Sequence, residues 1–97
     1  MKVRIHGSAR QELRDATRWY LDHDVGTAVR FLDALDEAIF RIGEDPDSLP
    51  FEHKHFRWIR IRHFPYRLIF EHPTPLEVMI IALVHTRRRP GYRLGRK

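Results

Sequence analysis

The fold is decided by residues 66–84, whose sequence is YRLIFEHPTPLEVMIIALV. The runs Tyr66–Glu71 and Glu77–Val84 are rich in aromatic, aliphatic and β-branched residues, and each has the length of a strand. The segment His72–Pro75 between them favours a turn, because proline has no backbone N–H to donate to a strand ladder. We therefore predict a β-hairpin, with Glu77–Val84 as the central strand of the sheet.

The run Val78–Val84 contains seven consecutive apolar residues, the longest such run in the chain. A membrane-spanning helix needs about 18 or more. The N-terminal residues Met1–Ile5 alternate apolar and charged side chains, a pattern that does not fit a signal peptide. The absence of cysteine excludes disulfides, thiolate metal sites and cysteine nucleophiles, and it suits a reducing compartment. We expect a cytoplasmic protein that does not enter a membrane.

Two further strands are predicted upstream of the hairpin. In Arg57–Arg62, Ile59 and Ile61 alternate with one tryptophan and two arginines, so that one face of the strand is apolar and the other is aromatic and basic. In Lys2–His6, two β-branched residues alternate with charged or polar neighbours. This alternation is typical of a short, half-buried strand.

Two amphipathic helices are predicted between the first two strands. The first begins at a capping box formed by Ser8 and Gln11, and its apolar residues recur at helical spacing until about residues 22–24. The second has an apolar stripe over residues 28–42 and ends before Pro46. The short connection makes the helices antiparallel neighbours, whose apolar stripes must be buried against the strands.

Residues 45–55 contain two prolines and no periodic pattern, so we predict a loop there. The element order is then βααβββ, an α+β fold in which an antiparallel helical hairpin packs on a mostly antiparallel sheet. A chain of 97 residues with 42% hydrophobic residues has room for one compact domain. We expect that domain to span residues 1–97, with a basic C-terminal tail over about residues 85–97.

The charge is distributed unevenly along the chain. Residues 1–50 hold seven Lys/Arg and ten Asp/Glu, a net charge of −3, whereas residues 51–97 hold eleven and three, a net charge of +8. Clustered cations gain free energy by releasing counterions from a polyanion. The second half is therefore expected to face an anionic partner, such as nucleic acid, a nucleoprotein or an acidic protein.

Several separated motifs together resemble one known family. They are Phe64–Phe70 (FPYRLIF), Ile80–His85 (IIALVH) and Arg87–Tyr92 (RRRPGY), preceded by the pairs Trp19-Tyr20 and Phe31-Leu32. In this order they resemble the ParE branch of the ParE/RelE superfamily of type II toxins, often called plasmid-stabilisation proteins. The resemblance spans essentially the whole chain. It implies a toxin that forms a hetero-oligomer with a co-expressed antitoxin, whose flexible segment folds over the toxin and neutralises it.

The resemblance leaves the target open. ParE-like toxins poison DNA gyrase without being enzymes themselves, whereas RelE-like toxins cut messenger RNA within the ribosome. Pro90-Gly91 in the tail is more similar to the ParE-like branch. We therefore expect a gyrase inhibitor, with a ribosome-dependent mRNA endoribonuclease as the alternative. A third possibility is an interaction module that binds antitoxin but has lost its toxicity.

A ribonuclease would need a general base, a general acid and cations that stabilise the extra phosphate charge. Arg67 lies in the strand where ribonuclease relatives carry a catalytic arginine, and His85 and Tyr92 lie in the C-terminal region where those relatives place acid and base groups. Arg87 and Arg62 could supply further positive charge. The simpler interpretations are a strand-end imidazole that bonds to a backbone carbonyl for His85, and a solvated charge for Arg67.

The target-binding residues are expected on two basic segments. The tail from His85 to Lys97 contains six Lys/Arg and no carboxylate, and guanidinium groups bind phosphates and carboxylates in bidentate geometry. The simpler interpretation is a frayed terminus that only aids solubility. The expected target-binding residues are Arg60, Arg62, Arg87, Arg88, Arg89, Tyr92 and Arg93.

The expected antitoxin-binding residues are the aromatic residues Trp58, Trp19 and Tyr20, because an exposed tryptophan is costly to leave in water. His53 and His55 have the spacing of a metal pair but lack an evident third ligand, so no metal site is predicted. Neither a Ser/His/Asp arrangement nor a phosphate-binding glycine loop is evident. We expect no cofactor.

Overall fold

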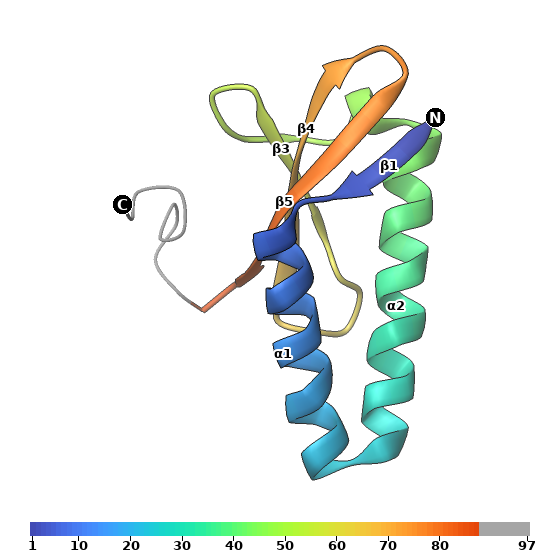
Figure 1. Cartoon of the computed structure of the whole chain (residues 1–97), viewed down its shortest axis with the longest axis vertical. Coiled ribbons are helices and arrows are strands. Elements are labelled where there is room, and N and C mark those ends of the chain that lie inside the picture. The colour runs from blue at the N-terminus through green and yellow to red at the C-terminus, as the bar shows by residue number, and fades with distance from the viewer. Residues whose placement is uncertain (88–97) are drawn as a thin grey trace.

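The computed structural model describes residues 1–87 and has an α+β architecture in which a helical hairpin covers one side of a five-stranded sheet (Figure 1). In chain order the elements are β1 (Lys2–Ile5), α1 (Gly7–His23), α2 (Val25–Glu44), the 3-10 turn η1 (Pro46–Ser48), β2 (Phe51–His53), β3 (Phe56–Arg60), β4 (Tyr66–Thr74) and β5 (Glu77–His85). The α+β class and the element order are those predicted, with one additional short strand, β2. Neither helix of this part of the chain is long and apolar enough to cross a membrane.

The strands lie in the order β1-β5-β4-β3-β2. All neighbouring pairs are antiparallel except β1 and β5, which are parallel. The predicted hairpin is formed by β4 and β5. The strand expected at the centre, β5, is an interior strand with a neighbour on each side, but the middle position belongs to β4.

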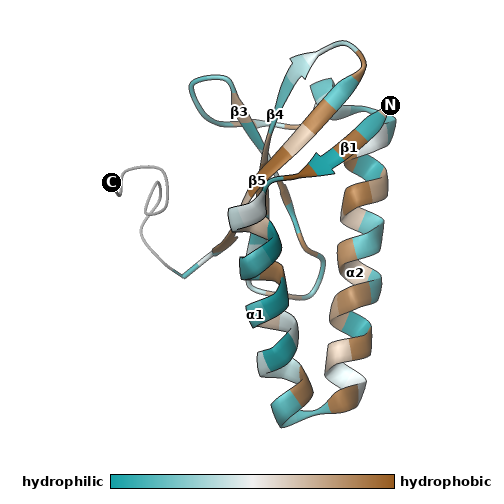
Figure 2. Cartoon of the chain, viewed as in Figure 1, coloured by the Kyte–Doolittle hydropathy of each residue, from teal (hydrophilic) through white to brown (hydrophobic). Residues whose placement is uncertain are grey.

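The core lies between the helical hairpin, α1 and α2, and the sheet. Its largest fully buried side chains include Phe31 and Ile42 of α2, Phe70 and Leu68 of β4, and Ile80 of β5. No polar or charged residue among 1–87 is buried. Figure 2 shows that hydrophobic positions recur along the whole of α2, whereas α1 is more hydrophilic. α2 therefore supplies the larger share of the helical contribution to the core.

Aromatic side chains pack together at the end of the core where the helices approach the β3–β4 turn. The rings of Tyr20, Phe31 and Phe64 lie 5.2–5.3 Å from one another, and Phe31 lies 5.8 Å from Tyr66. Burial, and secondarily the neighbouring Tyr66, raise the pKa of Tyr20 above the ordinary value for tyrosine. Tyr20 is thus half-buried and packs against the core.

The predicted capping box at the start of α1 is wrong. The helix is capped by His6, whose Nδ1 accepts a hydrogen bond from the backbone N–H of Ser8 at 3.2 Å. The Ser8 hydroxyl donates instead to the carbonyl of Ile81 in β5, at 3.3 Å. Gln11 bonds along the helix to Asp15. Ser8 therefore connects α1 to the sheet and does not close the first turn of its own helix.

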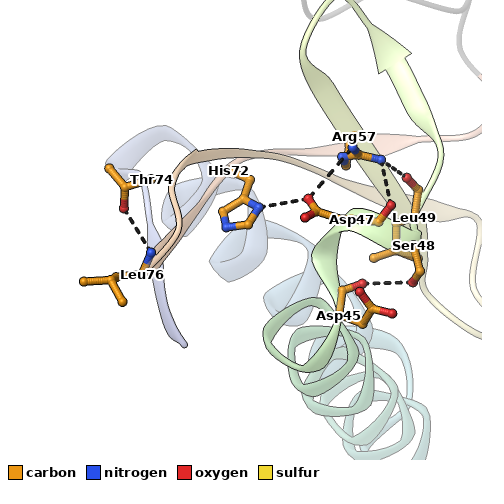
Figure 3. Close-up of polar contacts among 8 residues, drawn as sticks. All are labelled: Asp45, Asp47, Ser48, Leu49, Arg57, His72, Thr74 and Leu76. Carbon is orange, nitrogen blue, oxygen red and sulfur yellow. Dashed lines mark hydrogen bonds and ion pairs between the residues drawn. The ribbon is translucent and has the colours of Figure 1, made fainter.

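The segment predicted as a loop over residues 45–55 contains η1 and β2, which pairs with β3. Arg57 holds this segment in place, because its guanidinium donates to the carbonyls of Leu49 at 2.6 Å and Asp47 at 3.2 Å (Figure 3). The same guanidinium lies 3.9 Å above the ring of Phe51. Asp47 also contacts His72 of β4 at 3.0 Å. These contacts from neighbouring strands order a segment that has no periodic pattern of its own.

α1 also covers the edge of β5 that β1 leaves open. β1 ends at Ile5, opposite Ile80, so the backbone of β5 has no strand partner on that side from residue 81 onward. The carboxylate of Glu12 accepts a hydrogen bond from the N–H of Leu83 at 2.9 Å. Together with the bond from Ser8 to Ile81, this contact satisfies polar backbone groups that would otherwise stay unpaired next to the core.

We predict that Glu12→Ala lowers the free energy of unfolding by about 1–3 kcal/mol, because it leaves the Leu83 N–H without an acceptor. Glu12→Gln keeps an acceptor oxygen in the same place and should lower the free energy of unfolding clearly less. Urea unfolding of the three proteins measures the difference. Equal losses for the two substitutions would show that the bond to Leu83 does not contribute.

Candidate functional site

A groove lined by several basic residues lies between α2 and the β3–β4 turn. It consists of two adjoining hollows of about 450 and 700 Å³ that share Ala34, Glu37, Arg62 and His63. We call this surface the basic groove, and its charged or titratable lining includes Arg30, Asp33, Glu37, Arg41, Arg60, Arg62 and His63.

Three elements bring these residues together. Arg30, Glu37 and Arg41 project from one side of α2, because residues three, four and seven positions apart share a helix face. Arg60 ends β3 and lines the groove at the end of the strand, although its pairing with Arg67 places it on the face of the sheet away from the helices. Arg62 and His63 follow in the turn. His63 has a φ of 70°, a left-handed conformation that histidine adopts more readily than most residues. The turn thus places Arg62 across the groove from Glu37.

The groove has an excess of positive charge. Arg62 lies 3.7 Å from Glu37, but the two side chains are 71% and 50% exposed, so this ion pair is weak. Arg30 bonds to the hydroxyl of Thr27 at 2.9 Å. Within residues 1–87, the side chains of Arg41 and Arg60 have neither a hydrogen bond nor an ion pair. Guanidinium groups without a carboxylate partner are available to an anionic ligand.

Arg30 is also part of the α2 cap. The carboxylate of Asp24 accepts hydrogen bonds from the hydroxyl and the N–H of Thr27, at 2.6 and 2.9 Å. These two bonds, followed by the charge of Arg30, lower the pKa of Asp24 below its ordinary value. The carboxylate therefore stays ionised, and the cap stays formed, to a lower pH than for an ordinary aspartate.

Of the predicted target-binding residues, Arg60 and Arg62 lie in the basic groove and Arg87 is exposed just after β5. Arg88, Arg89, Tyr92 and Arg93 lie outside the described residues. Sequence reasoning did not single out Arg30, Arg41 or His63. The two arginines lie off the apolar stripe of the second helix, as many solvent-exposed charges do. Only the docking of α2 beside the β3–β4 turn brings them near Arg60 and Arg62.

Arg67, a predicted catalytic residue, lies on the side of the sheet away from the helices. Its guanidinium contacts the carboxylate of Glu52 at 2.8 Å and lies 4.7 Å from the ring centre of Trp58. The Arg67 and Glu52 side chains are only 23% and 11% exposed. Arg67 is therefore held in a partly buried ion pair, and Trp58, predicted to bind antitoxin, is half-buried beneath it.

His85 projects from the other side of the sheet. It pairs with Tyr66 in the β4–β5 register, and the two rings meet edge to face at 5.2 Å. Directly paired residues share a face, whereas successive residues of a strand alternate. Because Tyr66 packs on the core beneath the helices and Arg67 follows it, Arg67 and His85 point to opposite faces. The structure therefore does not bring together His85, predicted as an acid–base group, and Arg67, predicted as the catalytic arginine.

His85 is engaged locally. Its Nδ1 accepts a hydrogen bond from the backbone N–H of Arg87 at 3.2 Å. The sequence suggested a strand-end imidazole bonded to a backbone carbonyl, and the backbone partner is an amide instead. The bond turns the chain where β5 ends, so that His85 has a structural role in positioning Arg87.

The predicted antitoxin-binding pair on α1 is divided between surface and core. Trp19 is 56% exposed and stacks on His23 at 3.9 Å, whereas Tyr20 belongs to the aromatic cluster of the core. Of the two histidines with the spacing of a metal pair, His55 is engaged with a carboxylate of the neighbouring strand. His55 contacts Glu71 at 3.0 Å, and residues 1–87 contain no group of three or more His, Asp or Glu side chains arranged to hold a metal ion.

Comparisons with known proteins agree with the fold. The family model described as the ParE toxin of type II toxin-antitoxin system, parDE, matches residues 3–90. A solved structure described as the chromosomal ParDE TA system from P. aeruginosa superimposes with a TM-score of 0.74 at 15% identity, covering 88% of this chain and 95% of that chain. A YoeB/ParE toxin from Agrobacterium tumefaciens superimposes with a TM-score of 0.58 at 14% identity, covering 88% and 98%. No curated protein is similar enough in sequence to match.

The position of Arg67 predicts a structural phenotype. Arg67→Ala should lower the free energy of unfolding by about 1–3 kcal/mol, because it leaves the carboxylate of Glu52 partly buried without its partner. Adding Glu52→Gln removes that charge and should restore part of the loss. The measurement is denaturant unfolding followed by circular dichroism. If Glu52→Gln adds a further loss in the Arg67→Ala background, the ion pair does not hold Arg67 in this position.

Proposed function

The chain belongs to the ParE toxin family of type II toxin-antitoxin systems, and from this premise we propose that it inhibits DNA gyrase by binding and without catalysis. In this proposal the toxin forms a hetero-oligomer with a cognate antitoxin that neutralises it. The toxin acts in the cytoplasm as one domain spanning residues 1–97, and it uses no cofactor.

The separation of Arg67 from His85 is the observation that carries the non-enzymatic proposal. Cleavage of RNA needs the base, the acid and the stabilising cation within hydrogen-bond reach of one phosphate. Arg67 is bound to Glu52 on one face of the sheet, while His85 contacts Tyr66 on the other. A single phosphate cannot contact both side chains, so the arrangement favours inhibition by binding over a ribosome-dependent endoribonuclease.

The basic groove supports an anionic target. Four arginines, His63 and two carboxylates line it, and Arg60 and Arg41 have no acidic partner within residues 1–87. Gyrase engaged on DNA offers phosphates as well as protein carboxylates, and guanidinium groups bind both. We propose that Arg60 and Arg62 contact this target together with Arg87 and the tail residues Arg88, Arg89, Tyr92 and Arg93.

We predict that Arg60→Glu with Arg62→Glu weakens inhibition of gyrase supercoiling about tenfold or more, because two cations that face the target become anions. The free energy of unfolding should stay within about 0.5 kcal/mol of the parent, since both side chains are exposed. The measurement is the toxin concentration that halves the supercoiling rate. Lys2→Glu with Arg10→Glu is the matched control, because it reverses two exposed charges outside the groove.

Three results would contradict this proposal in different ways. If gyrase supercoils DNA normally at a large excess of the parent toxin, gyrase is not the target. New cleavage sites in ribosome-bound messenger RNA would favour the endoribonuclease. Normal growth after induction without antitoxin would show that the chain is not toxic and acts only as an interaction module.

A further inference from the structure

The charges along the α2 wall of the basic groove change sign twice. The charged residues that line the groove from this helix recur at spacings of three and four, so they form a row on one helix face: Arg30, Asp33, Glu37 and Arg41. All of them are exposed. Within residues 1–87, the carboxylate of Asp33 has neither a hydrogen bond nor an ion pair. The α2 wall is therefore basic at its two ends and acidic in the middle.

The ion pair between Arg62 and Glu37 crosses the groove. Both residues line each of the two hollows, and the guanidinium lies 3.7 Å from the carboxylate. The pair therefore lies where the hollows meet. Since both side chains are largely exposed, the pair is weak, and an incoming carboxylate can take the place of Glu37 at little cost in free energy. Glu37 is thus an internal competitor for the guanidinium of Arg62.

Arg41 supplies a second cation beside this ion pair. It follows Glu37 by four residues, one helical turn, which places the two Cβ atoms about 5–6 Å apart. Its guanidinium has no acidic partner within residues 1–87, so it is available to a ligand. In an extended chain, side chains two residues apart lie on the same face and are separated by about 6.6 Å. Two carboxylates at positions i and i+2 of an extended segment therefore match the spacing of the two arginines, one at Glu37 and one at Arg41.

The carboxylates of the α2 wall disfavour the DNA backbone as the occupant. A DNA duplex carries one negative charge per about 1.7 Å of helix axis, so it would bring phosphates near Asp33 as well as near the arginines. Like charges that face each other across an interface cost free energy. A protein segment can place carboxylates at the arginines and neutral residues elsewhere. The rest of the lining includes the apolar residues Ala34, Ala38 and Phe64, which suit the side chains of a peptide.

We propose that the basic groove binds an extended acidic segment of the target protein, in which one carboxylate displaces Glu37 from Arg62 and a second, two residues away, pairs with Arg41. The identity of the target rests on the proposed function, whereas the chemistry and the spacing of the segment rest on the groove. Glu37 limits the affinity, because the segment must break the pair between Arg62 and Glu37 in order to bind.

Two short peptides of the same composition and charge test this proposal against the purified full chain. Each consists of serine with two glutamates, which stand at positions i and i+2 in one peptide and at i and i+1 in the other. Because distant cations attract both peptides equally, a difference in affinity reports on the groove. In an NMR titration, the i, i+2 peptide should bind about fivefold more tightly. Equal affinities, or no binding of either peptide, would overturn the proposal.

Charge reversal in the groove makes the test specific. Arg41→Glu with Arg62→Glu should weaken binding of the i, i+2 peptide about tenfold or more. Lys2→Glu with Arg10→Glu is the matched control, because it changes the net charge equally outside the groove. All four residues are exposed, so both variants should keep the parent unfolding midpoint. Equal losses of affinity in the two variants would contradict the assignment to the groove.

A short DNA duplex is the probe for the alternative occupant. The groove variant Arg41→Glu with Arg62→Glu should lose no more affinity for the duplex than the control variant does, because the two have the same net charge. A larger loss in the groove variant would assign the groove to the DNA backbone and overturn the proposal.

The displacement of Glu37 has its own test. Glu37→Gln and Asp33→Asn each remove one carboxylate from the α2 wall, but only Glu37 is paired with Arg62. Glu37→Gln should therefore raise the affinity for the i, i+2 peptide about threefold more than Asp33→Asn does. Equal gains would show that the removed charge matters only through its general repulsion, and they would overturn the displacement of Glu37 by the segment.

The source of the segment is tested with gyrase free of DNA. The i, i+2 peptide should compete with the full chain for binding to gyrase, and the i, i+1 peptide should compete less. If the chain binds gyrase and neither peptide competes, the segment does not belong to the target and the proposal is overturned. If the chain does not bind gyrase at all, the proposed function fails, and the peptide titrations alone still decide the chemistry of the groove.

Discussion

The parallel pairing of β1 with β5 is the constraint on which the rest of the structure depends. The N-terminal strand adds to the strand that ends the described chain, through bonds such as that from the His6 N–H to the Ile80 carbonyl at 2.8 Å. Both helices lie in the connection that follows β1, so the pairing fixes where the hairpin starts. Ser8 and Glu12 of α1 then bond to the part of the β5 edge that β1 does not reach. The helical hairpin is thereby held on one side of the sheet, and the two faces of the sheet carry different functional side chains.

This arrangement separates the groups that a ribonuclease would need to bring together. The helix-covered face contains the aromatic cluster and His85, while the opposite face holds Arg67 in its ion pair with Glu52. The available cations gather instead where α2 meets the β3–β4 turn. In our account, the surface offered to a target is thus this basic groove and not a catalytic centre on the sheet.

Much of the fold follows from sequence periodicity, because long apolar stripes and alternating runs depend on local spacing. The α+β class, both helices and the β4–β5 hairpin are predicted in this way. The short strand β2 is missed because Arg57 and Asp47 order it through contacts that no local pattern reveals. At the candidate site, the side-chain alternation along β4 and β5 is itself a local pattern, and it suffices to place Arg67 and His85 on opposite faces once the register of the hairpin is fixed. The proximity of Arg41 and His63 to Arg62 has no such local signal, because it depends on how α2 docks.

The central claim is that the chain acts by binding gyrase and not by cutting RNA. Its most direct test is to recover gyrase-linked DNA from cells after the toxin is induced without antitoxin, and to map the DNA ends that the enzyme holds. A toxin that traps gyrase on cleaved DNA should raise the number of such ends well above that in uninduced cells. Growth arrest with an unchanged number of gyrase-linked ends would contradict the account.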